Sequence, residues 1–201
     1  LIKGIGSEDI ANRFSKKMLA GKWGGTMVLT EPDAGSDLGA LTTSAKRNPD
    51  GTYSISGNKI FISGGEQNYH ENIIHAVLAR IEGAPEGTKG ISLFIVEKNQ
   101  NGFSALEMKK MGMRSSKLAE LVFNDCIVPK GQLLGPLNSG FRSAIKVLSK
   151  GRAIAAAFAV GIADEALKQT VEYVKNRQQG GAPLINNQFI RFTLADMKTR
   201  L

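Results

Sequence analysis

The sequence predicts an α+β fold in which a β-barrel or β-sandwich is followed by long helices. Two observations predict this division of the 201 residues. Short β-prone runs separated by Gly, Pro, Asn and Asp recur between residues 26 and 123, as is typical of a barrel or sandwich. After Pro129 the sequence is punctuated by Gly and then becomes Ala-rich with apolar residues at helical spacing.

A short helix is expected first, over residues 7–20. Ser7 can cap its N-terminus, and Glu8 and Asp9 suit the first turn because carboxylates interact favourably with the positive end of a helix dipole. Apolar residues recur at helical spacing until Gly21, which ends the helix.

Seven β-prone runs are expected after this helix. They cover residues 26–30, 42–46, 53–56, 59–63, 73–81, 91–96 and 119–123. The Asp-Gly pair in residues 48–51 is a strong hairpin signal, and Gly57-Asn58 predicts a second turn.

Two helices are expected in the last third of the chain. The first covers about residues 139–176, where Ala and Gly residues permit close helix packing. The second begins near Asn186 or Asn187. It is still in a helical pattern at Leu201, with no Gly or Pro stop, so the chain is expected to be truncated.

Composition excludes several classes of protein. No apolar run approaches the roughly 20 residues of a membrane span, and the first residues lack the layout of a signal peptide, so a soluble protein is expected. The single Cys126 is expected to be a buried thiol in a reducing compartment. His70 and His75 match no recognised ligand spacing; they are interpreted as surface polar groups and no metal is predicted.

The formal net charge of +8 favours polyanionic partners. The basic residues are dispersed, however, and aromatic residues make up only 6% of the chain. The stacking platform of a single-strand nucleic-acid binder is therefore missing. A basic nucleic-acid-binding barrel stays open only as an alternative.

The loop Thr30–Asp37 carries the most specific pattern in the sequence. Hydroxyl groups of Thr30 and Ser36 flank a tight turn, and Gly35 lets the backbone come close to a ligand. Exposed N–H groups in such turns favour anions or carbonyl oxygens. An ordinary Asx-rich turn is the alternative interpretation.

This loop and the apolar strand before it resemble the signature of the acyl-CoA dehydrogenase family, in which a Thr-Glu-Pro-x-Ala-Gly-Ser-Asp string follows a short strand. The resemblance continues in the same order along nearly the whole chain. It includes residues 57–63, 110–116, 120–123, 128–129, 134–135, 140–141, 151–152, 177 and 194–197.

The resemblance implies three parts. Residues 1–24 would end an N-terminal helical region, residues 25–132 would form an antiparallel middle β-barrel that faces FAD and acyl-CoA, and residues 133–201 would begin a truncated C-terminal four-helix domain. It also implies FAD-dependent α,β-dehydrogenation of an acyl-CoA thioester, as in fatty-acid oxidation. Electron-transfer flavoprotein would be the acceptor, the full-length protein a homotetramer, and the compartment the cytoplasm or, in a eukaryote, the mitochondrial matrix.

Site residues follow from the matching positions. Cofactor contacts are implied for Met27, Leu29, Thr30, Gly35, Ser36, Phe61, Ile62, Ser63, Arg177 and Gln188. In this set Thr30 would bond the pyrimidine end of the flavin ring, and the Ser63 hydroxyl would lie near flavin N5. Acyl-CoA contacts are implied for Ser36, Ser149 and Arg152.

Some positions depart from the family pattern. Phe61 and Ser63 stand where the family commonly has Trp and Thr, and Ser149 stands where relatives commonly have an acidic residue. Gly180 replaces the aromatic of an Arg-x-x-Phe-Gly string, which removes a packing surface for the cofactor and adds backbone freedom.

The catalytic base is the missing part. In the family a Glu removes the α proton while hydride passes to the flavin, and hydrogen bonds to the thioester carbonyl stabilise the developing charge. Most relatives carry this Glu beyond the position of Leu201; a minority carry it directly before the matching Arg152, where this chain has Gly151. Glu165 and Glu172 are interpreted as exposed. A non-catalytic flavin- or CoA-binding module and an acyl-CoA oxidase remain alternatives.

Overall fold

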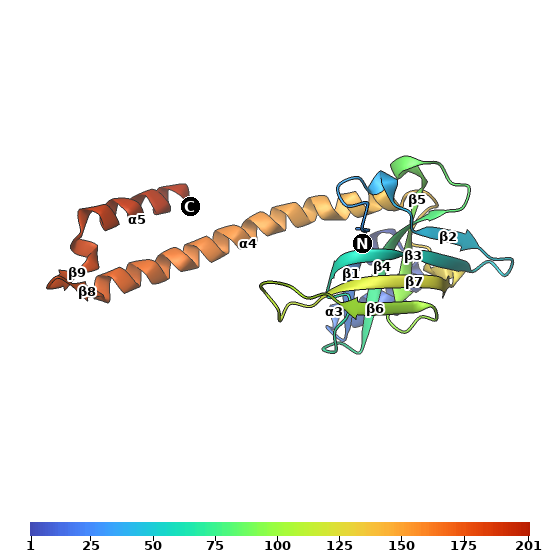
Figure 1. Cartoon of the computed structure of the whole chain (residues 1–201), viewed down its shortest axis with the longest axis horizontal. Coiled ribbons are helices and arrows are strands. Elements are labelled where there is room, and N and C mark those ends of the chain that lie inside the picture. Colours follow the sequence, from blue (N-terminus) through green and yellow to red (C-terminus); the bar gives the residue numbers. More distant parts are fainter. The chain divides into compact units, whose positions relative to one another are not determined.

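The computed structural model describes all 201 residues and divides into two units, residues 1–146 and residues 147–201 (Figure 1). The first unit contains a curled sheet preceded by short helices, and the second contains helical segments and a small hairpin. The predicted α+β class is confirmed. None of the helices combines the length and hydropathy that a bilayer crossing requires.

The N-terminal segment is helical in short pieces. These are α1 (Ile2–Ile5), α2 (Glu8–Ile10), a π-helical turn (Ala11–Ser15) and α3 (Lys16–Leu19). The predicted cap is confirmed, because the Ser7 hydroxyl accepts the Ile10 N–H at 3.3 Å. Gly21, with φ of +70°, turns the chain out of the helix as expected.

Seven strands form one mixed sheet. They are β1 (Trp23–Val28), β2 (Ser44–Arg47), β3 (Tyr53–Ser63), β4 (Asn72–Ile81), β5 (Ile91–Glu97), β6 (Phe103–Glu107) and β7 (Leu118–Val128). Strands β1 and β2 pair in parallel with successive parts of β4, and every other pairing is antiparallel. The long β1–β4 connection, which contains the β2–β3 hairpin, makes the parallel pairing possible.

The turn predicted at Gly57-Asn58 is wrong. Strand β3 continues through this pair, and its register against β7 shifts between Ile55 and Gly57. Gly57 has φ of +154°, and a Cβ there would lie 2.4 Å from the Thr43 hydroxyl oxygen. The glycine therefore permits close approach of Thr43, which precedes β2, and the extra residue at the irregularity lies in β7, so β3 continues without reversing.

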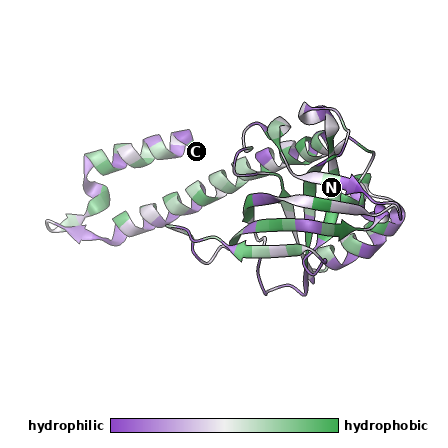
Figure 2. Ribbon diagram, turned by 45° about the vertical axis from the view of Figure 1, so that its right-hand side comes forward, coloured by the Kyte–Doolittle hydropathy of each residue, from purple (hydrophilic) through white to green (hydrophobic).

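Two hydrophobic clusters lie on opposite faces of β4. Val77 and Ala79 belong to the cluster inside the curled sheet, whereas Ala76 and Leu78 belong to a cluster with Phe14 of the N-terminal segment. Strand β4 is consequently buried on both faces. Figure 2 shows the hydrophobic residues concentrated along the strands.

Leu78→Ala should lower the free energy of unfolding by about 2–5 kcal/mol, because it removes buried methyl groups and leaves a cavity. Leu78 is 0% exposed. Chemical denaturation with Leu106→Ala as control would test this, since Leu106 is 60% exposed on edge strand β6. Equal effects at both positions would contradict the described burial.

The predicted late helices are confirmed within two residues. Helix α4 (Gly140–Asn176) begins in the first unit and continues into the second, and α5 (Gln188–Arg200) is capped by the Asn187 side chain, which accepts the Phe189 N–H at 2.9 Å. Between them, β8 (Gln178–Gln179) and β9 (Ala182–Pro183) form a hairpin.

Candidate functional site

The loop after β1 forms the predicted tight turn. Glu31 N–H donates to the Ala34 carbonyl at 3.0 Å, and Ala34 N–H donates back to the Glu31 carbonyl at 3.2 Å. Gly35 and Ser36 follow and are exposed. Asp37 then accepts the Gly39 N–H at 2.9 Å and closes an Asx-type turn.

The Glu31 carboxylate fixes this loop from inside. It accepts bonds from the backbone N–H and the hydroxyl of Thr42, at 2.7 and 2.8 Å, and of Thr43, at 3.0 and 2.6 Å. It also accepts a bond from Lys59 at 2.9 Å. Burial alone would raise the pKa of Glu31, but bonds from Thr43 and Lys59 lower it to about 2. The carboxylate is therefore ionised under ordinary conditions.

Lys59 of β3 completes a buried ion pair. Its side chain is 0% exposed, and its ammonium donates to Glu31 and to the Leu29 carbonyl, each at 2.9 Å. Burial lowers the pKa of Lys59, while the hydrogen bond and charge of Glu31 oppose that change. The strand and the loop are thus joined by charge-assisted hydrogen bonds out of contact with water.

Backbone bonding brings the two predicted cofactor segments together. The Ile60 N–H of β3 donates to the Thr30 carbonyl at 2.9 Å. Phe61, the next residue, has φ of +59° and is 57% exposed, at a register shift between Lys59 and Ile62. A left-handed Phe is unusual, and such strain is concentrated at functional sites.

Ser63 and Ile62 take opposite positions next to Phe61. Ser63 is exposed on the same strand. Ile62 is 3% exposed and packs in the cluster inside the sheet. The side chain of Ile62 is therefore core, and only its backbone can contribute to a cofactor surface.

Met27 and Leu29 lie on the other side of β1 from the interior of the sheet. Both are half-buried and pack against the cluster that contains the N-terminal helices. Met27 also lines a surface cavity of about 540 Å³ with Trp23, Met18 and His70. Thr26 and Val28 point inward, so the alternation of side chains along β1 places Met27 and Leu29 on the opposite face.

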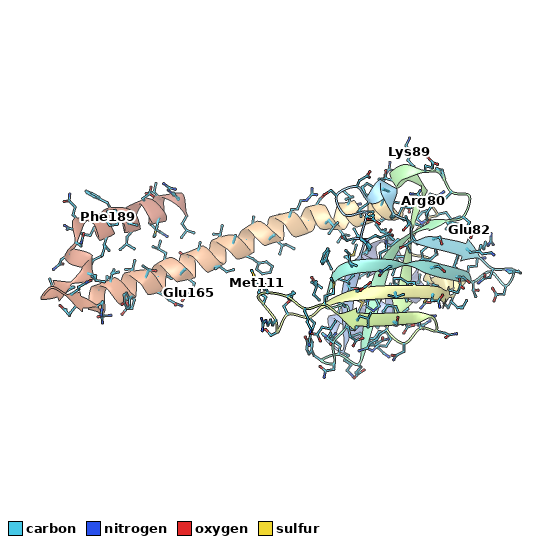
Figure 3. The ribbon with its side chains drawn as sticks, in the orientation of Figure 1. Arg80, Glu82, Lys89, Met111, Glu165 and Phe189 are labelled. Carbon is cyan, nitrogen blue, oxygen red and sulfur yellow. The ribbon has the colours of Figure 1, made fainter.

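The remaining predicted contacts lie in the second unit. Ser149, Arg152, Arg177 and Gln188 are all exposed there. Glu165 and Glu172 are also exposed on α4, as predicted, and Glu165 is marked in Figure 3.

The Gly180 departure has a local explanation in the β8–β9 hairpin. Gly180 and Gly181 have φ of +60° and +79°. Two successive residues with positive φ are what the favoured two-residue hairpin turn requires. An aromatic side chain at position 180 would be strained in this turn.

The interpretation of His75 as a surface group is wrong. It is 0% exposed on β4, its Nδ1 lies 2.8 Å from the Thr26 hydroxyl oxygen, and its Nε2 has no partner. Burial, together with the positive charge of Lys98, lowers the pKa of His75 to about 3. His75 is therefore neutral, and its strand is buried because the sheet has a cluster on each face.

Of two other titratable groups, Cys126 is as expected, whereas His70 is only partly exposed. His70 is half-buried and lies within hydrogen-bond distance of Gln67. Cys126 is a buried free thiol as predicted, and burial raises its pKa to about 12. The 201 residues contain no group of three or more His, Cys, Asp or Glu that could hold a metal ion.

Comparison with known proteins decides the family. The profile of the acyl-CoA dehydrogenase middle domain matches residues 26–126, and that of the acyl-CoA dehydrogenase C-terminal domain matches residues 138–201. The chain belongs to the acyl-CoA dehydrogenase family. This family is flavin-dependent. The match includes both the Thr30–Asp37 loop and the strand that holds Phe61 and Ser63.

Two curated relatives illustrate the match. An acyl-CoA dehydrogenase of Bacillus subtilis (strain 168) is 42% identical over 199 residues, which cover 98% of this chain and 50% of the relative. The short-chain specific acyl-CoA dehydrogenase of Megasphaera elsdenii is 41% identical over 198 residues, which cover 98% of this chain and 50% of the relative. The chain therefore spans about half the length of the curated relatives that it matches.

Solved structures give the same result. Butyryl-CoA dehydrogenase from Megasphaera elsdenii has a TM-score of 0.89 and 40% identity, covering 98% of this chain and 51% of that structure. A glutaryl-CoA dehydrogenase from Mycobacterium smegmatis in complex with FADH2 has a TM-score of 0.84 and 29% identity, covering 98% and 48%.

The ion pair between Glu31 and Lys59 was not predicted from the sequence. One signal was available: Tyr53, Ile55 and Lys59 are odd-numbered positions of one strand, and alternation places all three on the inward face. A Lys at an inward position requires a carboxylate partner. The identity of that partner depends on how the loop folds over β3, which alternation does not reveal.

Proposed function

We propose that the protein to which these residues belong catalyses FAD-dependent α,β-dehydrogenation of an acyl-CoA thioester. In this proposal residues 25–132 are the middle domain, residues 1–24 end a preceding helical region and residues 133–201 begin the C-terminal helical domain. The observation that supports it is the bond from Ile60 N–H to the Thr30 carbonyl, which joins the signature loop to the strand of Phe61 and Ser63.

The exposed groups at this junction suit a flavin. Phe61 offers an aromatic surface to a planar ring, and Thr30 and Ser63 offer hydroxyl groups that can bond its polar edges. Met27, Leu29, Gly35, Ser36 and the Ile62 backbone would border the same ligand. Bound flavin would supply a hydride acceptor; the residues of this chain would orient it and exclude water from one side.

Acyl-CoA contacts are proposed in each unit. Ser36 of the loop would contact both the flavin and the thioester, and Ser149 and Arg152 of α4 would contact the acyl-CoA. Arg177 and Gln188 would contact the FAD of a neighbouring subunit. Since position 151 is Gly, we propose that the base that removes the α proton lies outside residues 1–201.

Partners and location are proposed by analogy with relatives. We propose electron-transfer flavoprotein as the acceptor and a homotetramer for the full-length protein. A solved structure named for the electron transferring flavoprotein of Acidaminococcus fermentans is similar to this chain, with a TM-score of 0.88 and 38% identity. Curated relatives include bacterial enzymes and mitochondrial isobutyryl-CoA dehydrogenases, so the cytoplasm or the mitochondrial matrix is the proposed compartment.

A second candidate keeps the site but changes the electron acceptor. A prolyl acyl carrier protein oxidase is similar to this chain with a TM-score of 0.88 and 28% identity. An acyl-CoA oxidase would reoxidise its reduced flavin with molecular oxygen, whereas a dehydrogenase would need a protein acceptor. Peroxide release during aerobic turnover separates the two candidates.

The deciding experiment is FAD titration of the full-length protein, followed by visible spectra with a panel of acyl-CoA thioesters. We expect FAD to bind and one thioester to bleach the flavin band. Bound flavin that no thioester bleaches would favour a non-catalytic module. A full-length protein that takes up no flavin would overturn the proposal, and salt-sensitive binding of nucleic acid would then identify the basic surface as the functional one.

Phe61→Gly should separate stability from cofactor binding. A left-handed residue other than Gly costs about 1–3 kcal/mol, so glycine should relieve strain and offset the loss of the exposed ring. Stability is expected to change little, while FAD affinity falls. The control is Asn138→Gly, which changes another residue of positive φ, +61°, outside the flavin-contacting segments and should leave FAD affinity unchanged. If FAD affinity is unaltered in Phe61→Gly, Phe61 does not contact the cofactor.

A further inference from the structure

We propose that the buried pair Glu31–Lys59 is a positioning device that sets the flavin-contacting loop and strand at one fixed spacing. Through this pair, Thr30 and Ser63 would reach the same cofactor. The inference rests on the proposed function, because the ligand is the same flavin. Glu31 and Lys59 would act through their neighbours and would not touch the cofactor themselves.

Several hydrogen bonds join the loop to the strand at this junction. The Lys59 ammonium donates to the Leu29 carbonyl and to the Glu31 carboxylate. The Ile60 N–H donates to the carbonyl of Thr30, the residue between Leu29 and Glu31. Three consecutive loop residues are thus tied to two consecutive strand residues. The next strand residue is Phe61, so the bonds end where the exposed surface begins.

Glu31 also fixes the other end of the loop. The Glu31 carboxylate also binds the backbone and hydroxyl groups of Thr42 and Thr43, which lie after the signature string. One side chain therefore closes the whole segment that carries Gly35 and Ser36. Movement of Glu31 would release both ends of that segment together.

Stability alone does not explain a buried ion pair. Lys59 and Glu31 are 0% and 3% exposed, and such pairs often contribute no more than apolar residues of similar volume. Directional bonds to a carboxylate and to the Leu29 carbonyl, in contrast, define a geometry that apolar contacts do not. The pair is expected to matter more for placement than for folding.

The chain contains a matched pair for comparison. Lys98 also donates to a carboxylate, that of Glu66, and to a backbone carbonyl, that of Gln67 at 2.9 Å. It has the same type of contacts as Lys59 but ties down a different loop, in which no flavin contact is assigned. Glu66→Gln/Lys98→Met therefore makes the same double substitution at a more exposed pair, without the proposed consequence for the flavin.

The test uses the full-length protein with the double substitution Glu31→Gln/Lys59→Met. This variant removes both charges together, so no buried charge remains unpaired, and it keeps the side-chain lengths. The amide nitrogen introduced by Glu31→Gln cannot accept a bond, so donors of Thr42 or Thr43 lose an acceptor. We expect the apo protein to fold with a Tm several degrees below that of the parent, while Kd for FAD rises about tenfold or more. The visible circular dichroism of bound flavin should also change. Glu66→Gln/Lys98→Met should leave Kd within about twofold of the parent.

The outcomes separate the two proposals. If the parent binds FAD and the folded double variant binds it equally well, the positioning inference falls while the proposed function stands. If the parent binds no FAD, both fall. Should the double variant fail to fold, Thr43→Val decides, because it removes only the hydroxyl bond to Glu31: unchanged FAD affinity and circular dichroism overturn the inference, and a severalfold weaker Kd supports it.

Discussion

Glu31→Ala should remove at least about 3–5 kcal/mol from the free energy of unfolding, because it leaves the buried Lys59 ammonium without its counter-charge. Four donors of Thr42 and Thr43 lose their acceptor in the same substitution. Domain stabilities are only about 5–15 kcal/mol, so a large part of the variant should be unfolded near body temperature. Urea denaturation followed by circular dichroism measures the loss.

Two further variants test the cause of this loss. Glu107→Ala removes an exposed carboxylate that pairs with Lys117, and exposed ion pairs contribute little to stability. Adding Lys59→Met to Glu31→Ala should recover part of the stability, since the unpaired charge is then gone. A double variant as unstable as Glu31→Ala alone would show that the loss comes from the threonines and not from the ion pair.

Local patterns in the sequence were sufficient for the elements that depend on local bonding. The Ser7 cap and the start of the last helix at Asn187 are set by side chains that bond N–H groups two or three residues later. The hairpin turn before β3 is set by Asp50 and Gly51. These predictions hold because the partners are neighbours in the chain.

Predictions failed where the local structure depends on contacts with residues that are distant in the sequence. Gly57-Asn58 carries turn residues, but Thr43 packs against Gly57 and the strand continues. Strand β6 was missed because Phe103–Glu107 is a short edge strand with one partner. The parallel pairing of β1 with β4 likewise depends on segments that are far apart in the sequence.

The candidate site shows the same division. Thr30, Gly35, Ser36, Phe61 and Ser63 are identified by local strings that resemble a family signature, and the structure exposes all but the half-buried Thr30. What the strings do not reveal is how these segments are held together. That depends on Glu31 and Lys59, and on the left-handed Phe61 at the shift in register, which arise only when loop and strand meet.

His75 should make the stability of the protein depend on pH from about 6.5 downwards, beginning above the range in which carboxyl groups titrate. Its pKa is about 3 in the folded protein and 6.5 in an unfolded chain, so the unfolded chain binds the proton more tightly and protonation favours unfolding. The full contribution of neutral His75 to the free energy of unfolding is present above pH 6.5 and is lost progressively as the pH falls towards 3. At about 1.4 kcal/mol for each tenfold change in proton affinity, the total is about 5 kcal/mol.

The His75 effect can be distinguished from that of Glu31 by its pH range. The Glu31 pKa falls from 4.5 to about 2 on folding, so its contribution is lost only below pH 4.5. Between pH 6.5 and 4.5 the slope of stability against pH should come from His75 and not from Glu31. His75→Gln should flatten the curve there. An unchanged slope in His75→Gln would mean that the buried imidazole is not the group that takes up the proton.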